Sequence, residues 1–363
     1  MLATPDLTQR LHRFAEAMPK VELHVHLEGS IAPETSLALA RRHHLKLPAE
    51  DEAGLRRWFR FRNFPHFIQV YAALCELLRT PEDFTFIVMA LGQELARQNV
   101  RYAEVTFTPY IHVLFQNKGL TPEELIAGLD AGRAEVKAKY GVELVWITDI
   151  PRNSSFNRLT GRYHGKASGP TVEMALAWQP HGVVALGLGG YEIGAPPEPF
   201  APAFARARAG GLRSAPHAGE HVGPAGVWGA IRALYAERIG HGVRAIEDPH
   251  LVDYLVAEQI PLEINPSSNI RLGIYPDFAA HPLRQLWDAG VLVTVNSDDP
   301  SLFNTTLNQE YRLLVDAFDF DADALEKVSL NAVRASFLPA ERKAAYLAAF
   351  QQDIRHLRAR LGL

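Results

Sequence analysis

The chain has 363 residues, of which 47% are hydrophobic and 21% charged, and its formal net charge is −4. This composition excludes a disordered chain, a collagen-like repeat and a coiled coil. A weakly acidic chain without clustered Lys and Arg binds nucleic acid and anionic membranes poorly, so we expect neither partner. Cys75 is the only cysteine, which excludes an intrachain disulfide and a cysteine-rich zinc site.

The N-terminal stretch MLATPDLTQRLHRFAEAMPK carries several charges and lacks the continuous apolar run of a signal peptide. No part of the sequence approaches the ~18 consecutive apolar residues of a membrane span. We therefore expect a cytoplasmic protein.

Short apolar runs alternate with longer helical patterns along the chain. The expected strands are residues 21–25, 102–107, 144–149, 183–188, 213–217, 238–240, 261–264 and 292–296. Most are continuously apolar, which is typical of parallel strands buried on both faces. The helical patterns include residues 83–98, 122–139, 199–209, 225–237, 249–258 and 322–337, with Thr121 as N-cap and Pro122 as first helical residue of the second.

Eight repeats of strand and helix predict an α/β fold, a (β/α)₈ TIM barrel, as a single domain over residues 1–363. The alternative is an open doubly wound sheet. No glycine-rich dinucleotide fingerprint follows the first strand, which argues against its nucleotide-binding version. The C-terminal stretch ERKAAYLAAFQQDIRHLRARLGL predicts an additional amphipathic helix.

The interval between the first and second strands, at about residues 31–100, is longer than a barrel needs and has a helical pattern. It contains the aromatic segment WFRFRNFPHFIQVY. This insertion is either a small satellite core or a lid over the mouth of the barrel, and both can hold at once.

Catalytic groups of TIM barrels sit at the C-terminal ends of the strands, so polar residues there are of special interest. The first strand ends in His24 and His26, which point to one face because they are two residues apart. This spacing alone is a weak signal, because satisfied or surface histidines show it too.

Three later strands also end in polar groups. His217 ends the fifth strand, with Glu220 on the following loop, and His241 ends the sixth between two glycines. The eighth ends in Asp298 and Asp299, whose mutual repulsion a divalent cation would relieve. The four ends together predict one mononuclear metal site.

Histidine nitrogens with a carboxylate favour zinc, with iron(II), cobalt or manganese as alternatives. The expected ligands are His24, His26, His217 and Asp298, with a position left for water. His241 and Glu220 remain for acid–base chemistry, and Asp299 for holding a substrate.

The segments KVELHVHLEGS, PHAGE, RIGHGV and VNSDDPSLF, in this order, strongly resemble the adenosine deaminase family of the amidohydrolase superfamily. The resemblance extends from about Lys20 to Phe303. It implies a (β/α)₈ barrel, one zinc ion per chain, and hydrolytic replacement of the 6-amino group of a purine by oxygen with release of ammonia.

By the same resemblance, the zinc ligands are His24, His26, His217 and Asp298, which also belongs to the catalytic set. Glu220 is implied as the acid that protonates ring N1, and exclusion of water is expected to raise its pKa when substrate is bound. His241 is implied to orient the attacking water and take its proton. Asp299 is implied to bond purine N7, and the backbone of Gly190 to bond N3.

Three departures from the family pattern bear on the substrate. Glu28 stands where many adenosine deaminases carry an Asp associated with the ribose 5′-hydroxyl, and Asn265-Pro266 stands where many carry Cys-Pro. GLGGYE resembles a bacterial branch that includes deaminases of 6-amino-6-deoxyfutalosine, a nucleoside bearing a benzoate. Its aryl group would need an apolar pocket, and its carboxylate a cation such as Arg60, Arg62 or Arg152.

We therefore favour a purine nucleoside enlarged at the 5′ end, with adenosine next and free adenine third. A binuclear amidohydrolase commonly uses a carboxylated lysine from the fourth strand, but that strand ends in GLGGYE without one. A non-catalytic nucleoside-binding protein is the alternative from another class. Purine and water are the expected small-molecule partners, and a homo-oligomer is possible.

Overall fold

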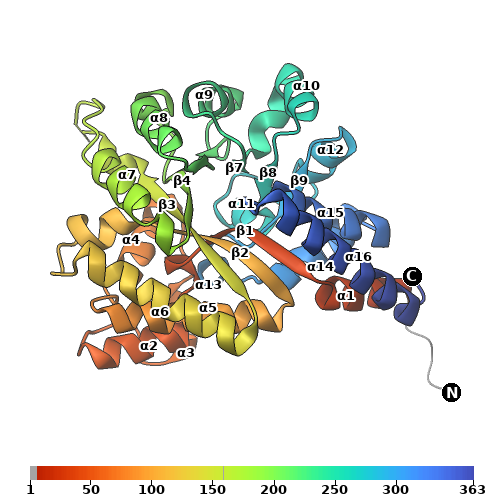
Figure 1. Ribbon diagram of the computed structural model, residues 1–363, viewed down its shortest axis with the longest axis horizontal. Helices are drawn as coiled ribbons and strands as arrows, with labels where there is room; N and C mark the ends of the chain where they lie inside the picture. Colours follow the sequence, from red (N-terminus) through yellow and green to blue (C-terminus); the bar gives the residue numbers. More distant parts are fainter. Residues whose placement is uncertain (1–5, 158) are drawn as a thin grey trace.

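The computed structural model describes residues 6–157 and 159–363, and it contains a barrel of parallel strands surrounded by helices (Figure 1). One sheet contains β1 (Lys20–His26), β2 (Val100–Phe107), β3 (Glu143–Pro151), β4 (Val183–Gly189) and β5 (Arg213–Ser214). The second contains β6 (His217–Ala218), β7 (Ile239–His241), β8 (Leu262–Ile264) and β9 (Val293–Val295). All pairings between neighbouring strands in the two sheets are parallel.

The fifth strand of the barrel is broken into β5 and β6, whereas the sequence predicted one strand over residues 213–217. The break falls at Pro216, which has no N–H to donate to a neighbouring strand. Ala215 N still donates to the Leu186 carbonyl at 3.1 Å, and the Pro216 carbonyl accepts from Gly240 N at 3.0 Å. β5 therefore continues the first sheet, and β6 begins the second.

The barrel closes where the residues after β9 meet β1. His26 N donates to the Asp298 carbonyl at 2.8 Å, and Asp298 N donates to the His24 carbonyl at 3.0 Å. The predicted (β/α)₈ architecture is confirmed, with β5 and β6 sharing one of its eight positions.

Helices follow the strands much as the sequence predicted. They are α5 (Pro81–Arg97), α6 (Pro122–Tyr140), α7 (Ser168–Ala177), α8 (Ala201–Ala209), α9 (Pro224–Leu234), α10 (Pro249–Glu258), α12 (Leu283–Asp288) and α15 (Ala322–Ala335). Thr121 caps α6 as expected, because its hydroxyl accepts from Glu124 N at 3.2 Å while the Glu124 carboxylate accepts from Thr121 N at 2.9 Å. α9 ends at Leu234, before the predicted residue 237, because Tyr235 turns the chain with a left-handed φ of 55°.

The insertion after β1 is helical but shorter than residues 31–100. It comprises α2 (Pro33–Arg42), α3 (Glu52–Trp58) and α4 (Phe64–Cys75), whereas α5 packs on α6 and β2 as a barrel helix. Phe67 of α4 stacks on Phe303, with ring centroids 5.6 Å apart and planes 12° from parallel. The aromatic segment thus packs into the same continuous hydrophobic core as the barrel strands and not into a separate satellite core. Its action as a lid stays a prediction.

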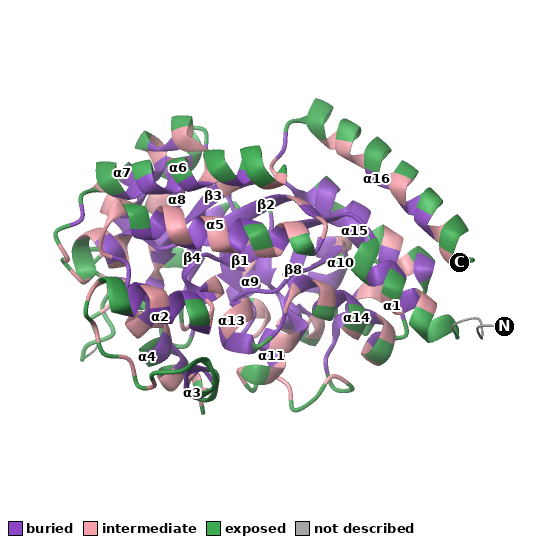
Figure 2. Cartoon of the chain, turned by 90° about the horizontal axis from the view of Figure 1, so that it is seen from below, coloured by how far each residue is buried: buried purple, intermediate pink, exposed green. Residues whose placement is uncertain are grey.

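Five further helices lie in the described part of the chain. They are α1 (Leu7–Ala17), α11 (Pro266–Arg271), α13 (Pro300–Phe303), α14 (Leu307–Phe318) and α16 (Ala340–Leu361). The single-turn segments are Glu28–Ser30, Ile111–Phe115 (a π-helical turn), Arg152–Ser155, Gln179–His181, Glu198–Phe200 and Val243–Glu247. Figure 2 shows the strands buried at the centre and α16 at the periphery with an exposed outer face. Across the described residues, no helix combines the length and the apolarity that crossing a bilayer requires.

Candidate active site

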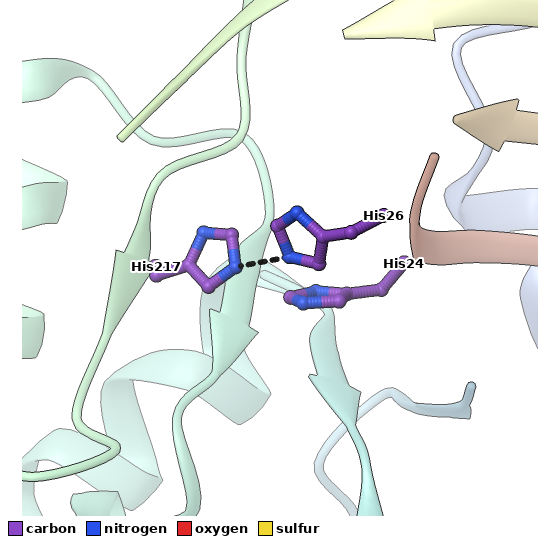
Figure 3. Close-up of side chains that lie close together, drawn as sticks. All are labelled: His24, His26 and His217. Atoms are coloured by element: carbon purple, nitrogen blue, oxygen red, sulfur yellow. Dashed lines mark hydrogen bonds between the residues drawn. The ribbon is translucent and has the colours of Figure 1, made fainter. Parts of the chain in front are cut away.

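Three imidazoles meet at the C-terminal mouth of the barrel (Figure 3). His24 and His26 alternate with Val25 along β1 and therefore share its inner face, while His217 comes from β6. His26 Nε2 lies 3.2 Å from His217 Nε2, and the rings of His24 and His217 have centroids 4.5 Å apart. The sequence prediction that these histidines converge is consistent with this placement.

Asp298 brings a carboxylate into the same cluster. Its Oδ1 lies 3.4 Å from His26 Nε2 and 3.6 Å from His24 Nε2, and its Oδ2 lies 3.8 Å from His241 Nε2. Both His241 and Asp298 have φ of 62°, in the left-handed region that residues with a side chain rarely adopt. Such strain is found where a structure aims particular side chains at one point.

The donors in this cluster suit one divalent metal ion. His24 Nε2 is buried without a hydrogen-bond partner, and its Nδ1 is bonded to the Glu263 carboxylate at 2.9 Å. The bond to Glu263 fixes which nitrogen faces the cluster. Donor atoms of His24, His26 and His217 lie within 4.8 Å of one another, as do those of His24, His241 and Asp298. Three imidazole nitrogens with one carboxylate form a donor set typical of zinc.

The two adjacent carboxyl groups differ in protonation. Burial raises the pKa of Asp298, but its bond to His24 and the charges of His241 and other imidazoles outweigh burial and hold that pKa well below its usual range. Burial and then the neighbouring charge of Asp298 raise the pKa of Asp299 well above its usual range. The site therefore favours the ionised form of Asp298 and the protonated form of Asp299, and a protonated carboxyl group can donate a hydrogen bond to a ring nitrogen.

Glu220 lies beside the cluster and faces the same space. Its Oε2 is 3.0 Å from His221 Nδ1, and its buried Oε1 has no hydrogen-bond partner and lies 3.8 Å from His241 Nε2. Burial raises the pKa of Glu220, but the imidazoles of His241 and His221 outweigh it and lower the pKa overall. The sequence-based expectation of a raised pKa concerned the substrate-bound site, and in this structure the neighbouring imidazoles reverse it.

A carboxylate that the sequence analysis missed holds the loop carrying Glu220. Glu192 is buried and accepts hydrogen bonds from four successive backbone N–H groups, which belong to Gly219 at 2.9 Å, Glu220 at 3.0 Å, His221 at 2.6 Å and Val222 at 3.0 Å. One anion at a run of N–H groups fixes the loop conformation. GLGGYE contains Glu192, but nothing in that motif indicates its partners.

The structure places Arg152 away from the cavity, in contrast to its expected contact with substrate. The guanidinium is buried, and it donates to the His217 carbonyl at 2.6 Å and to the Ala195 carbonyl at 2.8 Å. It therefore fixes the backbone beside a candidate ligand. Arg60 and Arg62 are exposed, and neither lines the cavity.

Glu28 is also absent from the cavity lining. It is fully buried, and its Oε1 accepts from Thr108 N at 3.0 Å and from His112 Nε2 at 2.8 Å. Instead of the expected substrate contact, Glu28 joins the turn after β1 (Glu28–Ser30) to the segment after β2. The other departure, Asn265, lies with Asn269 at His241, where each amide nitrogen is 3.3 Å from Nδ1.

A cavity of about 340 Å³ opens above the cluster. His26, His217, Glu220, His241, Asp298, Asp299 and Gly190 line its inner end. Its apolar wall comes from α4 and the π-helical turn after β2, through Phe64, Phe67, Ile68, Ile111 and Phe115. Asp149 and Asn153 also line it, although the sequence analysis singled out neither. The cavity can hold a planar heterocycle against the cluster and a larger substituent against the wall.

Comparisons with known proteins agree with this geometry. The family model described as adenosine deaminase matches residues 19–352. The chain is 41% identical over 336 residues to the aminodeoxyfutalosine deaminase of Streptomyces avermitilis, covering 92% of this chain and 90% of that one. It is 38% identical over 331 residues to the adenine deaminase of Rhodospirillum rubrum, and the alignment covers 91% of this chain and 95% of that one.

A solved structure has the same fold. It is an amidohydrolase from Burkholderia ambifaria with bound Zn, which superposes with a TM-score of 0.88 at 26% identity and covers 99% of this chain and 97% of its own. The chain therefore belongs to the adenosine deaminase family and is a hydrolytic deaminase.

Proposed function

We propose that this protein is a zinc-dependent deaminase that replaces the 6-amino group of an adenine nucleoside by oxygen. One observation carries the proposal. The donor cluster of His24, His26, His217 and Asp298 opens into the same cavity as Glu220 and Asp299, two groups suited to proton transfer. Zinc held by this cluster supplies Lewis acidity that makes water a nucleophile at neutral pH.

The side chains around the cluster account for the proton movements. His241 takes the proton of the attacking water. Glu220, whose pKa the imidazoles hold low in the protein without substrate, gains a proton when the purine excludes water from the site, and it then protonates ring N1 as the carbon–oxygen bond forms at C6. The carbon–nitrogen bond then breaks as His241 returns its proton to the amino group, which leaves as ammonia, while the hydroxyl proton on C6 returns to Glu220 and the 6-oxo group forms. Asp299 donates its proton as a hydrogen bond to N7, which holds the ring in register with Glu220.

For the substrate, we propose a nucleoside enlarged at its 5′ end, such as 6-amino-6-deoxyfutalosine. The apolar wall formed by α4 and the π-helical turn suits an aryl substituent. The 41% identity to an aminodeoxyfutalosine deaminase supports the same choice. We expect the reaction to take place in the cytoplasm.

Free adenine is the alternative substrate, ranked after the enlarged nucleoside and adenosine. Among the lining residues in the described parts of the chain there is no Lys or Arg to pair with a substrate carboxylate. The 38% identity to an adenine deaminase points the same way.

The test is a comparison of kcat/KM for 6-amino-6-deoxyfutalosine, adenosine and adenine with the zinc-loaded protein. We expect the enlarged nucleoside to give the highest value, followed by adenosine. A preference for adenine of about 100-fold or more would overturn the nucleoside proposal, because it would mean that the sugar and its 5′ substituent weaken transition-state binding instead of strengthening it. Absence of ammonia release from all three would overturn deamination of this purine class.

A further inference from the structure

His221 follows Glu220 in the loop after β6 and contacts the carboxyl group that acts as the acid in the proposed reaction. Its Nδ1 lies 3.0 Å from Glu220 Oε2, and the two side chains are only 8% and 7% exposed, so water barely screens the contact. Glu220 lines the cavity, whereas His221 is not among the lining residues. His221 can therefore influence the reaction only through its contact with Glu220.

Two aromatic rings from separate segments hold the imidazole of His221 in place. Phe64 of α4 lies edge-on to it, with ring centroids 4.9 Å apart, and Tyr191 after β4 does so at 5.0 Å. The backbone is fixed as well, because His221 N donates to Glu192 at 2.6 Å and the His221 carbonyl accepts from the Arg244 guanidinium. The ring therefore has little freedom to turn away from its carboxylate partner.

The surroundings of the two ring nitrogens indicate where His221 carries its proton. Neither nitrogen makes an aligned hydrogen bond to the described residues, but Nδ1 is the one at ion-pair distance from a carboxylate oxygen. Attraction by that oxygen favours the proton on Nδ1, so His221 presents an N–H towards Glu220 Oε2 in its neutral and its charged form alike. Oε1 of Glu220, which is buried without a hydrogen-bond partner, is then the oxygen left to carry a transferable proton.

We propose that His221 is a positioning residue for Glu220, which keeps its N–H against Oε2 and so directs the proton of the acid to Oε1. The inference rests on the proposed function, because that function makes Glu220 the acid for N1. N1 is present in nucleosides and in the free base, so the role does not depend on the 5′ substituent. Phe64 lines the cavity and also packs on His221, so it links the apolar wall to the acid.

The kinetic test uses two variants that separate the ring of His221 from its N–H. His221→Phe keeps an aromatic ring against Phe64 and Tyr191 but has no donor, whereas His221→Asn keeps an N–H at the place of Nδ1 without the ring. Exposed His250→Phe is the matched control and should behave as wild type. The substrate is whichever of 6-amino-6-deoxyfutalosine, adenosine and adenine the zinc-loaded wild type deaminates fastest. We expect His221→Phe to lower kcat by about 10- to 100-fold with KM nearly unchanged, and His221→Asn to recover most of that loss.

A second comparison places His221→Phe in the Glu220→Gln background. Because His221 acts through Glu220, the added substitution should change the residual kcat by less than about 2-fold. An unchanged kcat in His221→Phe alone would overturn the proposal. The same loss in both backgrounds would also overturn it, because that result would mean that the variant damages the cavity and not the acid.

A measurement without turnover tests the contact itself. Burial lowers the pKa of His221, but the contact with Glu220 outweighs burial and raises that pKa above its usual value. The other titratable groups beside His221 are retained in Glu220→Gln, and they are Glu192, Arg152, Arg244 and Tyr191.

NMR titration of the zinc-loaded protein should therefore give a lower pKa for His221 in Glu220→Gln than in wild type. The His221 signal is identified by its loss in His221→Phe, and an equal pKa in the two proteins would overturn the contact. Failure of wild type to deaminate any of the three purines would instead overturn the proposed function, so the two failures are distinguishable.

Discussion

The Glu263 carboxylate accepts a hydrogen bond from Nδ1 of His24 at 2.9 Å, and this contact leaves Nε2 as the nitrogen that faces the cluster of candidate metal ligands. Glu263 is itself held by the buried guanidinium of Arg238, which also pairs with Glu104 at 2.7 Å. A chain of buried charges thus runs from the barrel interior to a candidate ligand. Such partners of ligating histidines usually affect metal affinity about 10- to 100-fold.

We therefore expect Glu263→Gln to weaken zinc binding by about 10- to 100-fold, because the neutral amide is a poorer acceptor for His24 Nδ1. Competition with a chromophoric chelator measures the affinity. Exposed Glu258→Gln is the control and should bind zinc as wild type does. Equal affinity in the Glu263 variant would show that His24 needs no such partner.

Replacing Glu220 by Gln should leave the zinc content unchanged and reduce kcat by about 10²- to 10⁴-fold, because the amide has the shape of the acid without its proton. Steady-state kinetics and metal analysis of one preparation provide both values. Near-normal turnover in this variant would remove Glu220 from the proton transfer to N1.

Glu192→Gln tests the carboxylate that binds four successive N–H groups. Hydrogen bonds to a charged acceptor contribute about 1.5–3 kcal/mol, so we expect a lower melting temperature and a reduction of kcat/KM by about 10- to 100-fold. Exposed Glu198→Gln on the same loop is the matched control. If the loop keeps its geometry without the anion, both variants will have wild-type kinetics.

Glu28→Asp shortens the reach of a buried carboxylate by about 1.5 Å. Thr108 N and His112 Nε2 then lose their acceptor, which should destabilise the protein by about 1–3 kcal/mol. The turn beyond Thr108 carries Ile111 of the cavity wall, so we expect KM to rise more than kcat falls. Exposed Glu34→Asp is the control for the substitution itself. A fall in kcat that is larger than the rise in KM would contradict this role of Glu28.

Glu310 gives a pH dependence of stability. Burial raises its pKa from 4.5 to about 7, so between these pH values the folded state binds more protons than the unfolded state. Stability should therefore fall as pH rises through this window, by about 3 kcal/mol from this group. Glu310→Gln mimics the neutral form of the side chain. Its free energy of unfolding, measured with urea at several pH values, should therefore lack that part of the decrease. Parallel profiles for the two proteins would contradict the shift.

Much of the fold follows from local features of the sequence. The continuous apolar runs predict buried parallel strands, and Thr121 and Pro122 predict the start of α6, because both signals act over a few neighbouring residues. Even the break in the fifth strand has a local cause in Pro216, although residues 213–217 were expected to be continuous. The length of the insertion, expected over residues 31–100, was overestimated, because helical periodicity alone does not distinguish α4 of the insertion from the barrel helix α5.

The supporting residues of the site depend on distant partners instead. Glu192 meets residues 219–222, Glu263 meets His24, and Asp149 is flanked by glycines of β4. Each looks like an ordinary strand or loop residue in the sequence, because burial and pairing arise only when separate strands meet. The same reason accounts for Arg152, whose position after the third strand pointed to the cavity although its partners are backbone carbonyls.

The closure of the barrel also sets an order of events during synthesis. Asp298 exchanges backbone hydrogen bonds with His24 and His26, so the same peptide groups that join the last strand position to the first bring a carboxylate to the imidazoles. A nascent chain that has left the ribosome only as far as α12 possesses the histidines but lacks this anion. The complete donor set of the proposed metal site therefore forms only after Asp298 has been synthesised, and we expect products terminated before that residue to bind zinc more weakly than the full chain.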